Sequence, residues 1–171
     1  MLRNAFIGAA AGAIGTVALN VTTYGDMALR GRPTSNTPAK LAGILANKVG
    51  LPLSTQGVGS HDEVAQNRES GLGALLGYVN GLGVGMIFGL LQPQMDNMPR
   101  LASAVGVGLA AMAASDVPTV VLGVSNPTKW GMSDWVSDLI PHLIYGLVTV
   151  AAYNTFAKRT SPLKRARGFF R

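Results

Sequence analysis

The chain has 171 residues, of which 48% are apolar and only 13% are charged, about half the charged share of roughly 25% that soluble domains carry. It contains 22 glycines, which weaken a soluble helix by about 1 kcal/mol each relative to alanine but let helix backbones approach closely in a membrane. It has no cysteine, which excludes disulfides, thiolate metal sites and cysteine nucleophiles. These totals favour a protein surrounded by lipid.

Four apolar stretches are long enough to cross a bilayer, which takes about 20 residues at a rise of about 1.5 Å each. They comprise residues 5–24, 71–91, 101–124 and 135–156. The first could instead be a cleaved signal peptide, but it is long for the apolar part of one, and no clear cleavage site is present. The sequence therefore predicts an all-α polytopic membrane protein, a bundle of four transmembrane helices in a single membrane domain (residues 1–171).

The longest connection, residues 25–70, contains a predicted short helix over residues 38–49. Asn36 or Thr37 can cap this helix, and Pro38 suits its first position. Its apolar residues recur at spacings of three and four: Leu41, Ile44, Leu45 and Val49. This pattern predicts an interfacial amphipathic helix, although an ordinary loop helix packed on the bundle has the same periodicity. The other connections are short, so we expect consecutive spans to lie antiparallel and side by side.

The basic residues indicate the orientation of the bundle. Six of the 14 lie in the C-terminal tail, residues 157–171: Lys158, Arg159, Lys164, Arg165, Arg167 and Arg171. A dense basic tail directly after a span is typical of a cytoplasmic end that contacts anionic lipid headgroups. The sequence therefore predicts a multi-pass protein of the inner (plasma) membrane with both termini in the cytoplasm. This placement of the charge argues against nucleic acid as a partner.

The second predicted span carries a row of glycines at every fourth residue. The row consists of Gly73, Gly77, Gly81, Gly85 and Gly89. Such a row forms a shallow groove in which a partner helix can lie backbone against backbone. Matching rows of small residues occur in the first span (Gly8, Gly12, Thr16) and in the third (Ala102, Gly106, Ala110, Ala114). The rows predict a closely packed monomeric bundle, or alternatively a homo-oligomer, a pore or a larger membrane complex.

Ionisable residues inside a span are costly and by default suggest function. Asp116 lies eight residues before the outer end of the third predicted span, and His142 lies eight residues after Asp134, at the outer start of the fourth. Both therefore lie about 12 Å below the same surface. Asp134, Asp138 and His142 share one helix face, because they follow each other at intervals of four.

Other features point to the same level of the membrane. Asn20 and Asn80 can approach it from the first two spans, and Pro118 and Pro141 each free a backbone carbonyl close by. An aspartate next to a histidine can take or release a proton near neutral pH. We therefore expect either a proton or cation site that opens to the outer face, or a satisfied polar network that only holds the helices together.

Catalysis and cofactor binding have little support in the sequence. Ser133 and Ser137 lie near the predicted cluster, but no nucleophile elbow or oxyanion motif accompanies them. The glycines at 81, 83 and 85 lie inside an apolar span without the strand that a phosphate-binding loop requires. Asp116, Asp138 and His142 supply too few certain ligands for a metal. We therefore expect no catalytic residue, no cofactor and no metal.

The fourth span resembles a known family. Its core reads Ser-Asp-Trp-Val-Ser-Asp-Leu-Ile-Pro-His-Leu-Ile-Tyr-Gly-Leu-Val over residues 133–148, with Gly-Val-Ser-Asn-Pro at 123–127 and Trp130 before it. This arrangement is similar to the YagU-like bacterial inner-membrane proteins, over roughly the last third of the chain. The resemblance implies a multi-pass protein and, from at least one family member, a link to acid resistance. It implies no catalytic residues, and Asp134 and Asp138 stand where the family tends to have glutamates.

The sequence as a whole favours a non-enzymatic membrane protein, either an accessory subunit or a stress-related protein, with a proton-responsive site at Asp116, Asp138 and His142. The first alternative is a small oligomeric ion or proton channel or transporter. The second is a membrane enzyme that acts on lipid.

Overall fold

The structure is a computed structural model, and it describes residues 1–51, 53, 63–95 and 97–159. All regular secondary structure within these residues is helical, which confirms the predicted all-α class. The described residues form five α-helices: α1 (Leu2–Arg30), α2 (Thr37–Lys48), α3 (Glu63–Leu91), α4 (Arg100–Val121) and α5 (Met132–Arg159). Two single 3₁₀ turns, η1 (Gln92–Gln94) and η2 (Pro127–Lys129), lie in the connections before α4 and α5.

Four of these helices, α1, α3, α4 and α5, are long and apolar enough to cross a membrane. Large apolar side chains cover the outside of the bundle; for example, Phe6, Val79 and Leu101 are each at least two-thirds exposed. The inside holds small and polar side chains, among them Ala11, Ala104 and Thr149, together with large ones such as Phe88 and Tyr153. The many large apolar side chains on the outside suit a protein whose solvent is hydrocarbon.

The helices begin and end differently from the predicted spans. α1 continues to Arg30 and ends at Gly31, whose φ of 63° gives the left-handed C-cap that glycine adopts without strain. α3 begins in the polar segment at Glu63, and α4 ends at Val121, three residues earlier than expected. Pro118 and Pro141 both lie inside their helices, as the sequence indicated.

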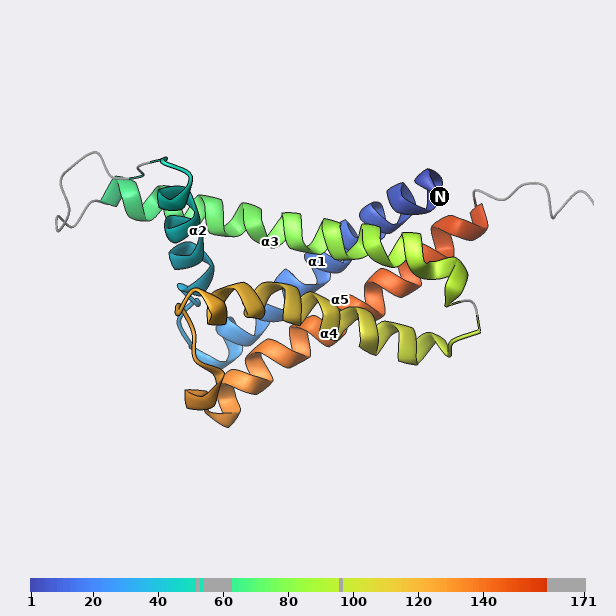
Figure 1. The fold of residues 1–171 in the computed structure, drawn as a ribbon. Helices are drawn as coiled ribbons and strands as arrows, with labels where there is room; N and C mark the ends of the chain where they lie inside the picture. The colour runs from blue at the N-terminus through green and yellow to red at the C-terminus, as the bar shows by residue number, and fades with distance from the viewer. Residues whose placement is uncertain (52, 54–62, 96, 160–171) are drawn as a thin grey trace, which may run out of the picture.

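The four long helices alternate in direction, so that the N-terminus and the end of α5 lie at the same end of the bundle (Figure 1). α1 packs extensively against both α3 and α5, and α4 packs mainly against α5. A short connection joins α3 to α4, but the contact between these two helices is smaller. Two of the three consecutive pairs of spans, α1 with α3 and α4 with α5, therefore pack closely side by side, as expected, whereas α3 and α4 contact each other less because α1 and α5 form the centre of the bundle.

Glycines allow α1 and α3 to cross with their backbones in contact. A Cβ on Gly85 would lie 2.7 Å from the Cα of Gly12, and a Cβ on Gly89 would lie 3.0 Å from the Cα of Gly8. Gly81 faces the Thr16 hydroxyl at the same crossing, but Gly77 has open space around it. Most of the glycine row of α3 is therefore used for packing within the chain.

The third span packs through a different face from the one predicted. Gly106 has no atom within 4 Å of an added Cβ, and Ala102, Ala110 and Ala114 are exposed as well. α4 instead turns Ala104, Gly108 and Ala111 inward, and Gly108 lies against the backbone of His142. Because α4 carries small residues on both faces, residue size alone could not show which face of α4 packs against the bundle.

The short helix α2 lies across the end of the bundle opposite the termini (Figure 1). It packs on the start of α3 through Leu41, Ala42 and Ala46, and Gly73 of α3 lies directly against its first turn. Leu45 and Val49, which we expected on the same face as Leu41, are exposed. Asn36 is the N-cap residue, but its side chain makes no capping hydrogen bond.

Candidate functional site

The inner face of α5 carries a polar side chain at nearly every turn. Asp138, His142, Tyr145 and Thr149 follow each other at intervals of four, three and four residues, the spacing that keeps side chains on one helix face. Tyr145 is 1% exposed and Thr149 is fully buried. Such a polar seam inside apolar helices is costly unless its members bond to one another or serve a function.

His142 lies between two helices, and both of its ring nitrogens face polar groups. Nδ1 lies 2.8 Å from the backbone carbonyl of Asp138 and 3.3 Å from the carboxylate Oδ1 of the same residue. Nε2 lies 3.4 Å from the hydroxyl of Ser115 on α4, a long hydrogen bond. Ser115 donates its own proton to the carbonyl of Met112 at 2.8 Å, so its oxygen is free to accept from the ring. A ring with a proton on each nitrogen therefore satisfies all of these partners.

Asp116 joins the same cluster from α4. Its carboxyl group is half-buried and interacts with Asp138, His142 and Ser115. Asp138 Oδ2 is buried and has no hydrogen-bond partner among the described residues. A proton held between the two carboxyl groups would supply the missing donor, because a protonated carboxyl group donates one hydrogen bond.

The structure thus brings together Asp116, Asp138 and His142, as the sequence indicated. The three other residues expected there lie differently. Asn80 donates a hydrogen bond of 3.1 Å to the carbonyl of Ala111, one turn further into the bundle. Asn20 is half-buried, and Asp134 is exposed at the start of α5, where its carboxylate accepts a bond of 2.9 Å from the Gly131 amide.

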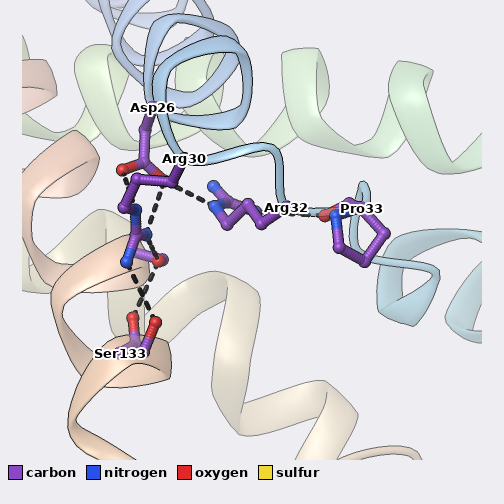
Figure 2. Close-up of polar contacts among 6 residues, drawn as sticks. Asp26, Arg30, Arg32, Pro33 and Ser133 are labelled. Carbon is purple, nitrogen blue, oxygen red and sulfur yellow. Dashed lines mark hydrogen bonds and ion pairs between the residues drawn. The ribbon is translucent and has the colours of Figure 1, made fainter.

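The sequence did not predict an arginine-centred network at the same end of the bundle. Arg30, the last residue of α1, binds both carboxylate oxygens of Asp26, with Nε at 2.6 Å and Nη2 at 2.7 Å (Figure 2). Its guanidinium also donates to the hydroxyls of Ser133, at 2.9 Å, and of Ser137 on the first turns of α5. Arg32 binds Asp26 as well. This network ties the end of α1 to the start of α5, where Ser137 directly precedes Asp138 in the sequence.

The predicted lipid-binding tail lies mostly outside the described residues. Of its basic residues, Lys158 is exposed near the end of α5, and Arg159 is the last residue of that helix. Lys164, Arg165 and Arg167 lie beyond residue 159 and thus outside the part of the chain that the structure describes. In that described part, no three His, Asp or Glu side chains are grouped so that they could hold a metal ion.

Comparisons with models of protein families, with curated proteins and with solved structures found no match to this chain. The resemblance of the fourth span to YagU-like proteins therefore remains a prediction.

Proposed function

We propose that this chain is a non-enzymatic, multi-pass protein of the inner (plasma) membrane whose Asp116, Asp138 and His142 side chains take up and release a proton. The observation that carries the proposal is the position of His142, with Asp138 on one ring nitrogen and Ser115 on the other. The unpartnered Asp138 Oδ2 adds a second place where a proton would be stabilised. Buried polar atoms in native proteins nearly always have a hydrogen-bond partner, so a buried carboxylate oxygen without one calls for an explanation such as a bound proton.

The wider role that fits this site is that of an accessory subunit or a stress-related protein that responds to proton concentration. The cluster lies near the end of the bundle opposite the termini, because α5 begins there only ten residues before His142 (Figure 1). In the orientation that we propose, with cytoplasmic termini, that end faces outward, and the basic tail contacts anionic lipid. The implied link of YagU-like proteins to acid resistance agrees with an outward-facing proton site.

The test is an NMR titration of the His142 ring in lipid nanodiscs. The chain has two histidines, so the variant His61→Gln leaves a single ring to observe. In this background we expect His142 to titrate, and we expect Asp138→Asn to move its titration curve. The matched control Asp134→Asn removes an equal charge at the exposed start of α5 and should leave the curve in place. An unchanged curve in Asp138→Asn would disprove the proton site.

Two further measurements separate the accessory role from the alternatives. A partner that co-purifies in fixed proportion after mild solubilisation would support the accessory role. Proton flux into proteoliposomes that is lost in His142→Gln would instead identify a channel or transporter. Turnover of a lipid that is lost in Asp138→Asn would identify an enzyme.

A further inference from the structure

A groove of about 330 Å³ lies on the outer side of α4, between this helix and the connection that leads to α5. Ten residues line it, and Asp116 is the only ionisable one among them. Along α4 the groove extends from Leu109 to Val121, which corresponds to about 18 Å at 1.5 Å per residue. Its volume lies at the lower end of the range of roughly 300–1,000 Å³ that is typical of ligand pockets.

The walls of the groove belong to the apolar outside of the bundle. Leu109, Val117 and Val120 line it, and each is between about two-fifths and three-fifths exposed. These are side chains that hydrocarbon would contact in a membrane-spanning bundle. A ligand would therefore enter sideways from the lipid rather than from water, and it needs an apolar chain.

Two tryptophans complete the groove at the end nearest the connection. Trp130 and Trp135 both line it, with their rings in edge-to-face contact at a centroid distance of 5.0 Å. The indole N–H of Trp130 donates to the hydroxyl of Ser125 at 3.2 Å, which fixes the orientation of this ring. Carboxylates and indole faces both attract cations, and aromatic side chains are the usual partners of quaternary ammonium groups.

We propose that this groove binds a lipophilic ammonium compound, with its positive head between Asp116 and the two tryptophans and its apolar chain along Leu109 and Met112. A single-chain cation fits better than a phospholipid, because none of the described residues that line the groove is a Lys or Arg that could neutralise a phosphate. The nearest basic residue in the sequence, Lys129, is exposed and lies outside the lining. The binding site shares Asp116 with the proton site: the ammonium head pairs with the ionised Asp116 carboxylate, in place of the proton that Asp116 and Asp138 otherwise share, and it does not require that site to function.

The two tryptophans are the only ones in the chain, so intrinsic fluorescence reports directly on the groove. The probe is a dodecyldimethylammonium compound that carries a nitroxide, which quenches indole fluorescence on contact. It is titrated into the full chain in a nonionic maltoside detergent, which contains no competing ammonium group. We expect saturable quenching, and we expect Asp116→Asn to weaken the apparent affinity about tenfold, the equivalent of about 1.4 kcal/mol. Asp134→Asn, which removes an equal charge outside the groove, should leave the affinity unchanged.

Two other compounds establish what the groove recognises. The same nitroxide chain with a hydroxyl head should show no saturable quenching, and dodecylphosphocholine should compete much more weakly than dodecyltrimethylammonium. Equal binding of the uncharged probe, equal competition by the phosphocholine, or unchanged affinity in Asp116→Asn would each overturn the proposal. The proton site is measured separately through the His142 titration, so that either proposal can fail while the other stands.

Discussion

The hydroxyl of Tyr145 on α5 donates a hydrogen bond of 2.6 Å to the backbone carbonyl of Gly81 on α3. The bond crosses the centre of the bundle, where Tyr145 is 1% exposed. A Cβ at position 81 would clash with the Thr16 hydroxyl of α1 but would lie in ordinary contact, at 3.5 Å, with the Tyr145 ring, so the glycine here serves the packing of α1. Tyr145, one of the polar side chains on the inner face of α5, thus links α5 to the same glycine row of α3 that α1 contacts.

Replacing Tyr145 by phenylalanine should lower the free energy of unfolding by about 0.5–1.5 kcal/mol, the usual net contribution of one hydrogen bond. Unfolding in mixed micelles measures the difference. Tyr78→Phe is the matched control, because Tyr78 lies on α3 but is 44% exposed. Equal stability of the Tyr145→Phe variant and the wild type would show that the bond does not hold the bundle together.

The crossing of α1 and α3 predicts opposite effects for two alanine substitutions in the same glycine row. Gly85→Ala should destabilise the fold by roughly 1–3 kcal/mol, because the new methyl group meets the backbone of α1 and forces the helices apart. Gly77→Ala adds a methyl group in open space and should be neutral or slightly stabilising. The same unfolding assay compares the two. Similar losses in both variants would contradict the crossing.

A second pair of substitutions tests which face of α4 is buried. Gly108→Ala should weaken the bundle, because its Cβ would lie 2.6 Å from the backbone oxygen of His142. Gly106→Ala, two residues away, should have no effect on a monomeric bundle. If Gly106→Ala were the more harmful of the two, α4 would pack through the row that the sequence had indicated.

The arginine network predicts a local effect at the start of α5. In Arg30→Gln the hydroxyls of Ser133 and Ser137 lose their link to α1, so the first turns of α5 should exchange backbone hydrogens faster in hydrogen–deuterium exchange. Arg32→Gln is the control, since Arg32 reaches Asp26 but neither serine. Equal exchange in Arg30→Gln and the wild type would mean that other contacts hold α5 in place.

The sequence predicts those features that depend on one helix at a time. Long apolar runs identified all four long helices, and the interval of four between Asp138 and His142 placed them together on α5. The common depth of Asp116 and His142 also followed from helix geometry, because it depends only on the number of residues from each helix end. The row from Gly81 to Gly89 identified a face that packs closely.

Features that depend on the relative rotation of helices could not be predicted. α4 has small residues on opposite faces, so neither size nor periodicity distinguishes the buried Gly108 from the exposed Gly106. The contact between Arg30 and Ser133 joins positions 103 residues apart and depends on two helix ends meeting. The groove beside Asp116 arises where the connection containing Trp130 folds back against α4, and no pattern in the sequence indicates that fold.

If the four long helices cross a membrane, α2 and the start of α5 lie at one side of it and the termini lie at the other. The chain has no cysteine, so single cysteines can be introduced at exposed positions and labelled in intact cells with a maleimide that cannot cross membranes. We predict labelling of Thr34→Cys and Thr128→Cys from outside, and labelling of Asn97→Cys only after the cells are opened. Labelling of all three positions in intact cells, or recovery of the chain in the soluble fraction without detergent, would contradict the account.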